Sequence, residues 1–355
     1  MSVLVISKGA LRRAVSRKHR SGLRFLVALA LLAVCPEAWP SPTAARLPLV
    51  LVADVPLPGK AVRFDYQDID VAKKRLFIAH MNDDSLVVVS TVDGSLLKVI
   101  SGIPTPRGVV VAGDCKRAFV TSTPERLVII DSESLTELGR VRTGRSPDGV
   151  AWDSVHRVVG VSDQGDGALS LIEGSGSGAR KQVALGRETG NVVFDPARAA
   201  FWVTVVAATV PDQLALVDPV AAKVIVRIPL PGCSGAHGLR LHPNGKSALV
   251  ACEANSKLAR VELAGDHALT LAPTGSDPDV LAIDAGLGLL YAAAESGDVT
   301  VFDLSKPGLA TVGHEHPGPA SHSVAVDATT HHVFFPLAVG PHGTPVLRIM
   351  RPTGT

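Results

Sequence analysis

Ser321-His-Ser-Val-Ala-Val-Asp327, followed by a polar turn and Val333-Phe-Phe335, is the stretch that decides the fold. It is a short apolar run that ends in an acidic residue, then a turn, then a second apolar run. Similar units occur six more times, and the seven units end at residues 70, 112, 153, 195, 242, 284 and 327. The steps between these ends are 42, 41, 42, 47, 42 and 43 residues. A period of about 40–45 residues with several short strands per unit is typical of a β-propeller.

The remaining composition agrees with this period. The chain has 355 residues, and its 33 Gly and 25 Pro lie between short apolar runs, as in turn-rich all-β proteins. We therefore predict an all-β fold, a seven-bladed β-propeller of four-stranded antiparallel blades. The last repeat supplies three strands, whereas residues 49–55 form a strand with no repeat of its own. We predict that this N-terminal strand completes the last blade and closes the ring.

The first 45 residues have a different character. They carry seven basic residues and one acidic residue, and residues 25–35 are an apolar run followed by small residues and prolines. This order predicts a signal peptide over residues 1–45 and one propeller domain over 46–355, with no membrane span after cleavage. The protein is then periplasmic or secreted. Lipid anchoring at Cys35 and an uncleaved membrane anchor are alternatives.

The charge of the chain argues against nucleic acid as a partner. The whole chain has a net charge of +2, and the first 45 residues contribute +6 of it, seven bases less one acid. The rest therefore carries about −4 and contains no basic run. Binding to nucleic acid relies on a basic surface that displaces counterions. We expect a small molecule or a protein as partner, and a monomer.

Three cysteines remain outside the N-terminal segment. Cys233 lies nine residues before the end of the fifth repeat unit at residue 242, and Cys252 lies ten residues after it. In a propeller blade these positions lie on the same rim. We predict a disulfide between Cys233 and Cys252, which an exported protein permits; two partly buried thiols are the alternative. Cys115 falls in a turn at the other rim, without an evident partner.

The repeat also predicts a ring of side chains at the axis. The residue five positions before each repeat end should lie near the start of the innermost strand, so the seven copies should converge at one face. These residues are Asp65, Arg107, Asp148, Gly190, His237, Asp279 and His322. The six ionisable ones form a candidate ligand-binding site.

Four members of this ring lie on neighbouring repeats. His237, Asp279, His322 and Asp65 offer two imidazoles and two carboxylates, which suit a divalent metal ion. Arg107 could pair with a flanking aspartate or bind an anionic group. The alternative interpretation is a water-filled neck in which opposite charges neutralise one another.

The repeats resemble a known family. Units that read as an apolar strand, Asp, a turn, Arg75-Leu-Phe-Ile-Ala79, a polar loop and then Leu86-Val-Val-Val89 are similar to those of the YVTN-repeat, YncE-like propellers. The resemblance covers residues 49–350, and it implies a seven-bladed exported propeller similar to the lactonase type. The Tyr-Val-Thr-Asn signature itself reads Phe77-Ile-Ala-His80 here, so the resemblance implies the fold more than an activity.

Two functions fit these observations. The first is an exported binding or interaction protein whose ligand or partner docks at the axial mouth. The second is a metal-dependent hydrolase of the lactonase kind, or a lyase, in which an axial ion activates a carbonyl or a water molecule. No nucleophile-elbow, zinc-protease, P-loop or dinucleotide motif is present in the sequence. Catalytic residues therefore stay unassigned, and the only cofactor that we predict is a divalent metal ion.

Overall fold

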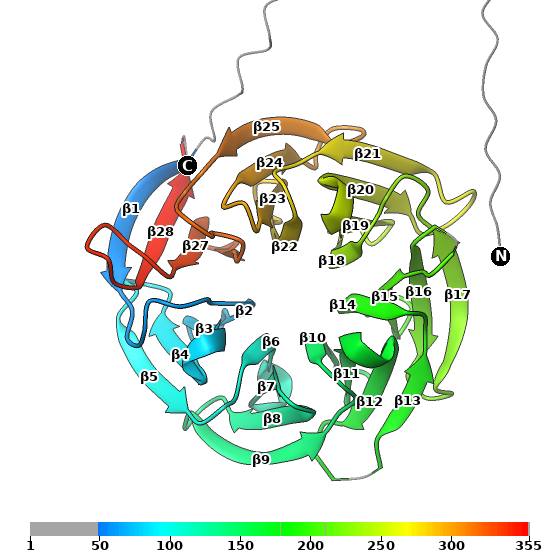
Figure 1. Ribbon diagram of the computed structural model, residues 1–355, viewed down its shortest axis with the longest axis horizontal. Helices are drawn as coiled ribbons and strands as arrows, with labels where there is room; N and C mark the ends of the chain where they lie inside the picture. Colours follow the sequence, from blue (N-terminus) through cyan, green and yellow to red (C-terminus); the bar gives the residue numbers. More distant parts are fainter. Residues whose placement is uncertain (1–48, 178, 210, 354–355) are drawn as a thin grey trace, which may run out of the picture. The chain divides into compact units, whose positions relative to one another are not determined.

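The described chain is a ring of seven sheets. The computed structural model describes residues 49–177, 179–209 and 211–353, so the predicted signal peptide and Cys35 lie outside the described residues. Each sheet is antiparallel and has four strands, and the sheets radiate from a common axis (Figure 1). The predicted seven-bladed propeller is confirmed. The described part of the chain contains no helix with the length and apolarity needed to span a bilayer.

The strands repeat in the same radial order in each blade. The innermost strands are β2 (Gln67–Asp70), β6 (Pro106–Ala112), β10 (Pro147–Asp153), β14 (Glu188–Asp195), β18 (Ala236–Leu241), β22 (Pro278–Asp284) and β26 (Ala325–Asp327). The second strands are β3 (Arg75–His80), β7 (Arg117–Ser122), β11 (Val158–Asp163), β15 (Ala200–Val206), β19 (Ser247–Cys252), β23 (Leu289–Ala294) and β27 (His332–Leu337).

The third and fourth strands of each blade also occur in the same radial order. The third strands are β4 (Ser85–Ser90), β8 (Arg126–Asp131), β12 (Ala168–Glu173), β16 (Gln213–Asp218), β20 (Lys257–Glu262), β24 (Val299–Asp303) and β28 (Val346–Pro352). The outermost strands are β5 (Leu96–Ser101), β9 (Thr136–Arg142), β13 (Lys181–Ala184), β17 (Lys223–Pro229), β21 (Leu269–Pro273), β25 (Ala310–Glu315) and β1 (Leu49–Pro56). Short 3-10 turns interrupt four connections, η1 (Met81–Asp83), η2 (Gly113–Cys115), η3 (Gln164–Asp166) and η4 (Glu253–Asn255).

The core lies between blades. The second and third strands are continuous apolar runs because each of their two faces packs against a neighbouring blade. Phe77 and Val88 of the first blade, for example, pack with Val109 and Val120 of the second. The outermost strands are more exposed, and in β17 exposed positions alternate with positions that are half-buried or buried. Burial between blades is therefore what holds adjacent sheets together.

The first and last strands of the described chain close the ring. β1 pairs with β28 in antiparallel register, so the sheet of the seventh blade has the order β1-β28-β27-β26. Arg348 strengthens this pairing through two hydrogen bonds to Asp54, Nε to Oδ1 at 2.8 Å and Nη2 to Oδ2 at 2.6 Å. Such paired, charge-assisted hydrogen bonds are among the stronger polar contacts in proteins. The predicted closure by the N-terminal strand is thus present.

A disulfide joins the start and the middle of the fifth blade. The structure links Cys233, which precedes β18, to Cys252, the last residue of β19, and both cysteines are buried. Cys115 is a free, half-buried thiol in η2. The disulfide restrains the connection that carries His237 into the axis.

Removing this disulfide should lower stability. We expect Cys252→Ser to reduce the free energy of unfolding by about 2–3 kcal/mol, because the crosslink closes a short loop and restricts the unfolded chain. Urea titration with and without a reductant would measure this effect. Cys115→Ser is the matched control and should change stability little. An unchanged titration for Cys252→Ser under oxidising conditions would contradict the expectation.

Candidate axial metal and ligand site

A repeated turn leads the chain into the axial ring. In five repeats the residue two positions before the ring residue has a positive φ, between 43° and 67°: Thr105, Ser146, Gly235, Asp277 and Ala320. Residues with a Cβ adopt this conformation only at a cost of roughly 1–2 kcal/mol. The same turn therefore recurs because it sets the path by which each innermost strand reaches the axis.

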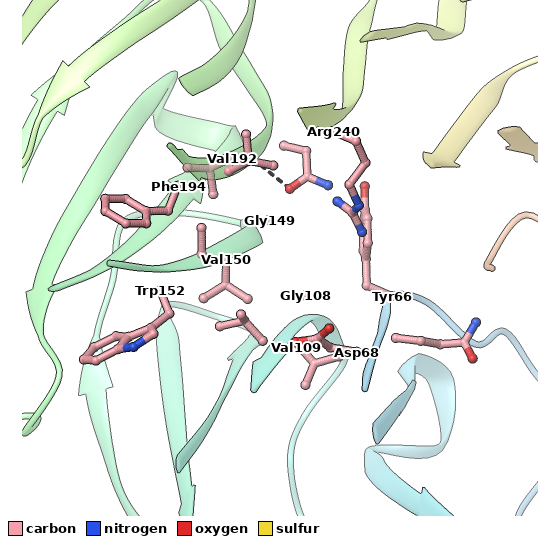
Figure 2. A pocket seen from close by; sticks show the side chains of 15 residues that line it. Tyr66, Asp68, Gly108, Val109, Gly149, Val150, Trp152, Val192, Phe194 and Arg240 are labelled. Carbon is pink, nitrogen blue, oxygen red and sulfur yellow. Dashed lines mark hydrogen bonds between the residues drawn. The ribbon is translucent and has the colours of Figure 1, made fainter. Parts of the chain in front are cut away.

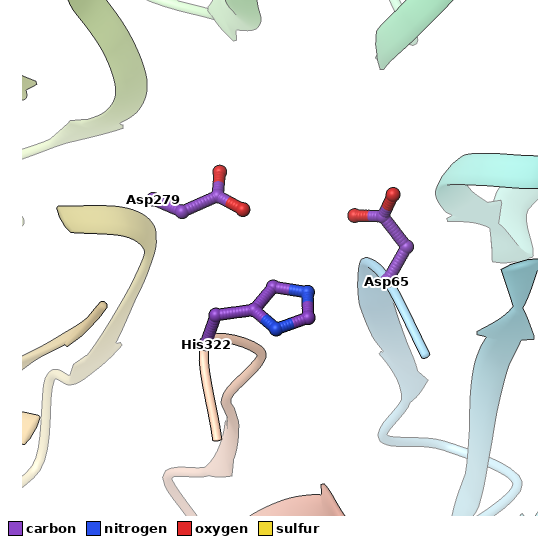
Figure 3. A group of neighbouring side chains, drawn as sticks. All are labelled: Asp65, Asp279 and His322. Atoms are coloured by element: carbon purple, nitrogen blue, oxygen red, sulfur yellow. The ribbon is translucent and has the colours of Figure 1, made fainter. Parts of the chain in front are cut away.

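Three of the ring residues meet at one point. Asp65 precedes β2 in the first blade, Asp279 lies in β22 of the sixth, and His322 precedes β26 in the seventh. One ligand atom from each of them lies within 4.8 Å of the others, and all three side chains are buried. Figure 3 shows the two carboxylates and the imidazole directed toward a common space. We call these three residues the axial triad.

The imidazole of His322 has a defined orientation. Its Nδ1 lies 3.1 Å from the carbonyl oxygen of Ala320. Because a carbonyl only accepts hydrogen bonds, Nδ1 carries the proton and Nε2 holds a lone pair. Nε2 is buried and has no hydrogen-bond partner, and the same is true of Oδ1 of Asp65. Buried polar atoms without partners are rare and point to a missing ligand or a catalytic role.

Two residues that the sequence did not single out complete this side of the ring. Arg63 donates from Nη1 to Oε2 of Glu295 at 2.9 Å, and its Nη2 lies 3.7 Å from Oδ2 of Asp279. Tyr66, which is buried, donates from its hydroxyl to Oδ1 of Asp279 at 3.2 Å. Both contacts hold Asp279 in place. The sequence does contain a signal for Tyr66: it places a large aromatic side chain at a position where three other repeats have glycine.

The other half of the ring forms an adjoining network that meets the triad at Asp279. Nε2 of His237 lies 3.4 Å from Oδ2 of Asp148 and 3.5 Å from Oδ1 of Asp279. Arg107 contacts Asp148 from the other side, with Nη1 3.8 Å from Oδ1, and donates to Gln164 at 2.8 Å. His237, which the sequence grouped with the metal ligands, is therefore placed beside the triad instead. It reaches Asp148 across the gap that Gly190 leaves in the blade between them.

The concentration of carboxylates changes the protonation of this site. Burial, together with the nearby charges of Asp279 and Asp148, raises the pKa of Asp65 to about 8. Burial disfavours the charged form of His237, but Asp279 and Asp148 raise its pKa above the ordinary value. Near neutral pH the metal-free site therefore keeps a proton on Asp65, and the same carboxylates favour the charged form of His237.

The raised pKa of Asp65 predicts a stability effect that depends on pH. Between pH 4 and pH 8 the folded chain holds a proton that the unfolded chain releases, so the contribution of Asp65 to stability falls as pH rises. The introduced asparagine cannot ionise, so the free energy of unfolding of Asp65→Asn relative to wild type should be higher at pH 8 than at pH 4. We expect this rise to be at least ~1.4 kcal/mol in chelator, which corresponds to one pKa unit. Urea titrations of both proteins at the two pH values would measure this gain. A difference that is the same at both values would refute it.

All six ionisable ring positions thus lie at one end of the axis, and the seventh is Gly190. Asp65, Asp279 and His322 converge on one point, whereas Arg107, Asp148 and His237 form the adjoining network.

Three other histidines, His80, His156 and His331, lie outside the ring. His80 is buried and stacks on Phe64 with ring centroids 4.0 Å apart. His156 and His331 bind Asp153 and Asp284 at the other ends of the innermost strands.

Comparisons with known proteins give the fold. No protein-family model and no curated protein match the sequence. Among solved structures, a chain of Kuenenia stuttgartiensis hydrazine synthase is similar, with a TM-score of 0.72, 14% identity, and coverage of 85% of this chain and 97% of that one. Staphylococcus aureus virginiamycin B lyase is also similar, with a TM-score of 0.68, 9% identity, and coverage of 85% and 99%. At these identities the likeness extends to the seven-bladed propeller fold, and both of these similar chains come from enzymes.

Proposed function

We propose that the axial triad binds one divalent metal ion and that this ion, with the charged groups around it, binds a small molecule at the axial mouth. The observation that carries the proposal is the pair of buried, unpartnered ligand atoms, Nε2 of His322 and Oδ1 of Asp65, beside the carboxylate of Asp279. Ligands of a single zinc ion lie about 2.0–2.2 Å from it and so at most about 4.4 Å from one another. The triad atoms lie within 4.8 Å of one another, so the three side chains would draw slightly closer around an ion. One imidazole and two carboxylates suit Zn²⁺ or Mn²⁺.

The surroundings of the triad favour a small ligand with an oxygen-rich group. A metal ion with three protein ligands keeps positions open for another molecule. Arg63 and Arg107 lie on either side of the triad and are half-buried, so each could contribute donors to an anionic group. The mouth therefore combines a cation site with two guanidinium groups, a set that fits a carboxylate, an ester or a lactone.

A metal-dependent hydrolase or lyase is the second candidate. The observation that favours it is His237, whose Nε2 lies between the carboxylates of Asp148 and Asp279 next to the triad. An imidazole held by carboxylates can take or give a proton near neutral pH. In such a reaction His237 would be the general acid or base, and Asp148 would orient it. A lyase is among the proteins of similar fold.

Two features from the sequence belong to this proposal. We infer export from the basic and apolar N-terminal segment, and the disulfide between Cys233 and Cys252 supports an oxidising compartment. Membership of the YVTN-repeat propellers is supported by the repeat pattern. Fractionation of cells that express the full chain, followed by detection of the protein in the periplasm or medium, would check the first inference.

Metal analysis tests the main proposal. Protein purified without chelator should contain close to one equivalent of Zn²⁺ or Mn²⁺ per chain by plasma mass spectrometry. After chelation, added metal at 100 times its Kd should stabilise the fold by ~2.7 kcal/mol. Titration near pH 7 in buffers of different ionisation enthalpy should show proton release, because Asp65 must lose its proton. Absence of both bound metal and stabilisation would refute a metal site.

The two candidate functions separate in a second experiment. Metal-loaded protein should be tested on a panel of lactones and esters, together with a His237→Gln variant that retains the metal. Turnover that His237→Gln abolishes would establish the enzyme. Binding of the same compounds without turnover would establish the binding protein.

A further inference from the structure

A second site lies further along the axis. Beyond the ring, the innermost strands of the first five blades line an open cavity of about 270 Å³. Tyr66 lines it, and the hydroxyl of the same residue donates to Asp279 of the axial triad. The cavity is therefore adjacent to the proposed metal site but is formed by different side chains.

Arg240 is the cationic group of this cavity. It lies in β18, in the central part of the innermost strand, and its side chain is half-buried. Nη1 donates to the carbonyl oxygen of Leu239 at 2.9 Å. Among the described residues no carboxylate lies within 4 Å of the guanidinium, although Asp68 is near enough for the two charges to interact. Figure 2 shows Arg240 beside Tyr66 at the edge of the cavity. Four N–H groups of Arg240 are thus left for other partners.

A second donor comes from Asn191. The backbone N–H of Val192 donates to Oδ1 of Asn191 at 2.7 Å, so the amide nitrogen remains to donate elsewhere. Gly149 makes this arrangement possible, because a Cβ at that position would lie 2.3 Å from Oδ1 of Asn191. Asn191 is buried and lines the same cavity as Arg240.

The remaining walls divide by polarity. Val109, Val150, Val192 and Phe194 lie across the space from Arg240 and Tyr66 (Figure 2), and the valines, which are mostly buried between blades, expose a small apolar surface to the cavity. Asp68 is the acidic group of the lining, and its Oδ2 accepts the backbone N–H of Val111 at 2.6 Å. The cavity thus offers two donor groups at one side, an apolar wall at the other, and one carboxylate.

We propose that this cavity binds a small monocarboxylate with an aliphatic body. The carboxylate would accept hydrogen bonds from Arg240 and Asn191, and the hydrocarbon part would pack on the valines and Phe194. A planar guanidinium matches a carboxylate in geometry. Phosphate and other dianions fit less well, because Asp68 repels the second charge and the apolar wall provides no donors. This site goes beyond the proposed function and does not depend on a bound metal.

The shape of the cavity favours a short ligand. The cavity is open on one side, and its volume is about 270 Å³. We expect butyrate and hexanoate to bind best, because their hydrocarbon part stays against the lining valines. Acetate would leave much of the apolar wall uncovered, and the end of decanoate would extend out of the cavity into solvent.

Calorimetric titration of the full chain with this series of sodium carboxylates, in chelator, tests the site. We expect saturable binding of one hexanoate per chain, and at least ~10-fold weaker binding to Arg240→Gln, because a charge-assisted contact is lost. Asn191→Ala should weaken binding severalfold. Asp68→Asn should bind hexanoate more tightly, because the repulsion between two carboxylates is removed. Misfolding cannot produce an increase in affinity, so this variant tests the site independently of folding. Arg227→Gln, an exposed arginine in β17, is the matched control and should bind as wild type.

Two results would overturn the proposal. The first is equal affinity of wild type and folded Arg240→Gln for hexanoate. The second is inorganic phosphate that binds as tightly as hexanoate and competes with it, which would indicate a general anion site. His322→Ala separates this site from the metal site, because that variant should keep its affinity for hexanoate whether or not wild type binds metal.

Discussion

A His322→Ala protein is expected to bind Zn²⁺ at least ~100-fold more weakly than wild type. The variant loses Nε2, which the hydrogen bond from Nδ1 to Ala320 orients toward Asp65 and Asp279. Loss of a partner that only orients a ligand already costs 10–100-fold in metal affinity, and loss of the ligand itself should cost more. Asp279→Ala should have a similar effect. Competition with a chromophoric chelator would measure both affinities.

The controls separate metal binding from general damage. His342 lies on an exposed loop, so His342→Ala should retain wild-type affinity. His322→Ala should also keep its cooperative unfolding in chelator, because the imidazole makes only one hydrogen bond in the fold. Retention of wild-type metal affinity by His322→Ala would mean that the ion, if bound, is held elsewhere.

The second large effect is expected from Gly238→Ala. A Cβ on residue 238 would lie 1.9 Å from the carbonyl oxygen of Asp279 in the neighbouring blade. This contact involves two backbones, so no side chain can rotate away to relieve it. We expect a loss of more than ~3 kcal/mol in stability, since overpacking that moves backbone is among the costlier substitutions. Displacement of Asp279 should also weaken metal binding in whatever protein folds.

Urea titration of Gly238→Ala gives the stability change, and Gly139→Ala is its control. Gly139 lies in the outermost strand β9, where a Cβ would meet no atom within 4 Å. Alanine there should be neutral or slightly stabilising, because it restricts the unfolded chain. A Gly238→Ala protein as stable as Gly139→Ala would show that the fifth and sixth blades can separate at low cost.

The fold could be predicted because one rule is repeated seven times. Five of the seven repeats end in an aspartate, and the carboxylates of Asp70, Asp153 and Asp284 each accept a hydrogen bond from the backbone of the following turn. Because the same turn is needed in most blades, this aspartate recurs at a regular spacing that can be seen in the sequence. The ring positions follow from the same period, since equivalent residues of a closed ring must meet at its axis.

Details inside the ring could not be read from the period. Asp65, Asp279 and His322 meet because they lie on three consecutive blades, but His237 leans toward Asp148 because Gly190 leaves a gap between them. Arg63 occupies a position at which no other repeat has a basic residue, and Arg240 occupies a position that is apolar in five other repeats. Such exceptions depend on neighbours in space, and a single sequence does not show which blades supply them.

The closure of the ring by β1 and β28 has a consequence for biosynthesis. The axial triad draws on the first, sixth and seventh blades, so its residues straddle the seam between the two ends of the chain. During synthesis β1 cannot pair with β28 until β28 has left the ribosome. Until that pairing forms, the distance between Asp65 and His322 is not fixed. A product that lacks β28 would therefore keep the three residues without the ring closure that fixes their positions. A bound ion would join the first, sixth and seventh blades and so stabilise the closed ring.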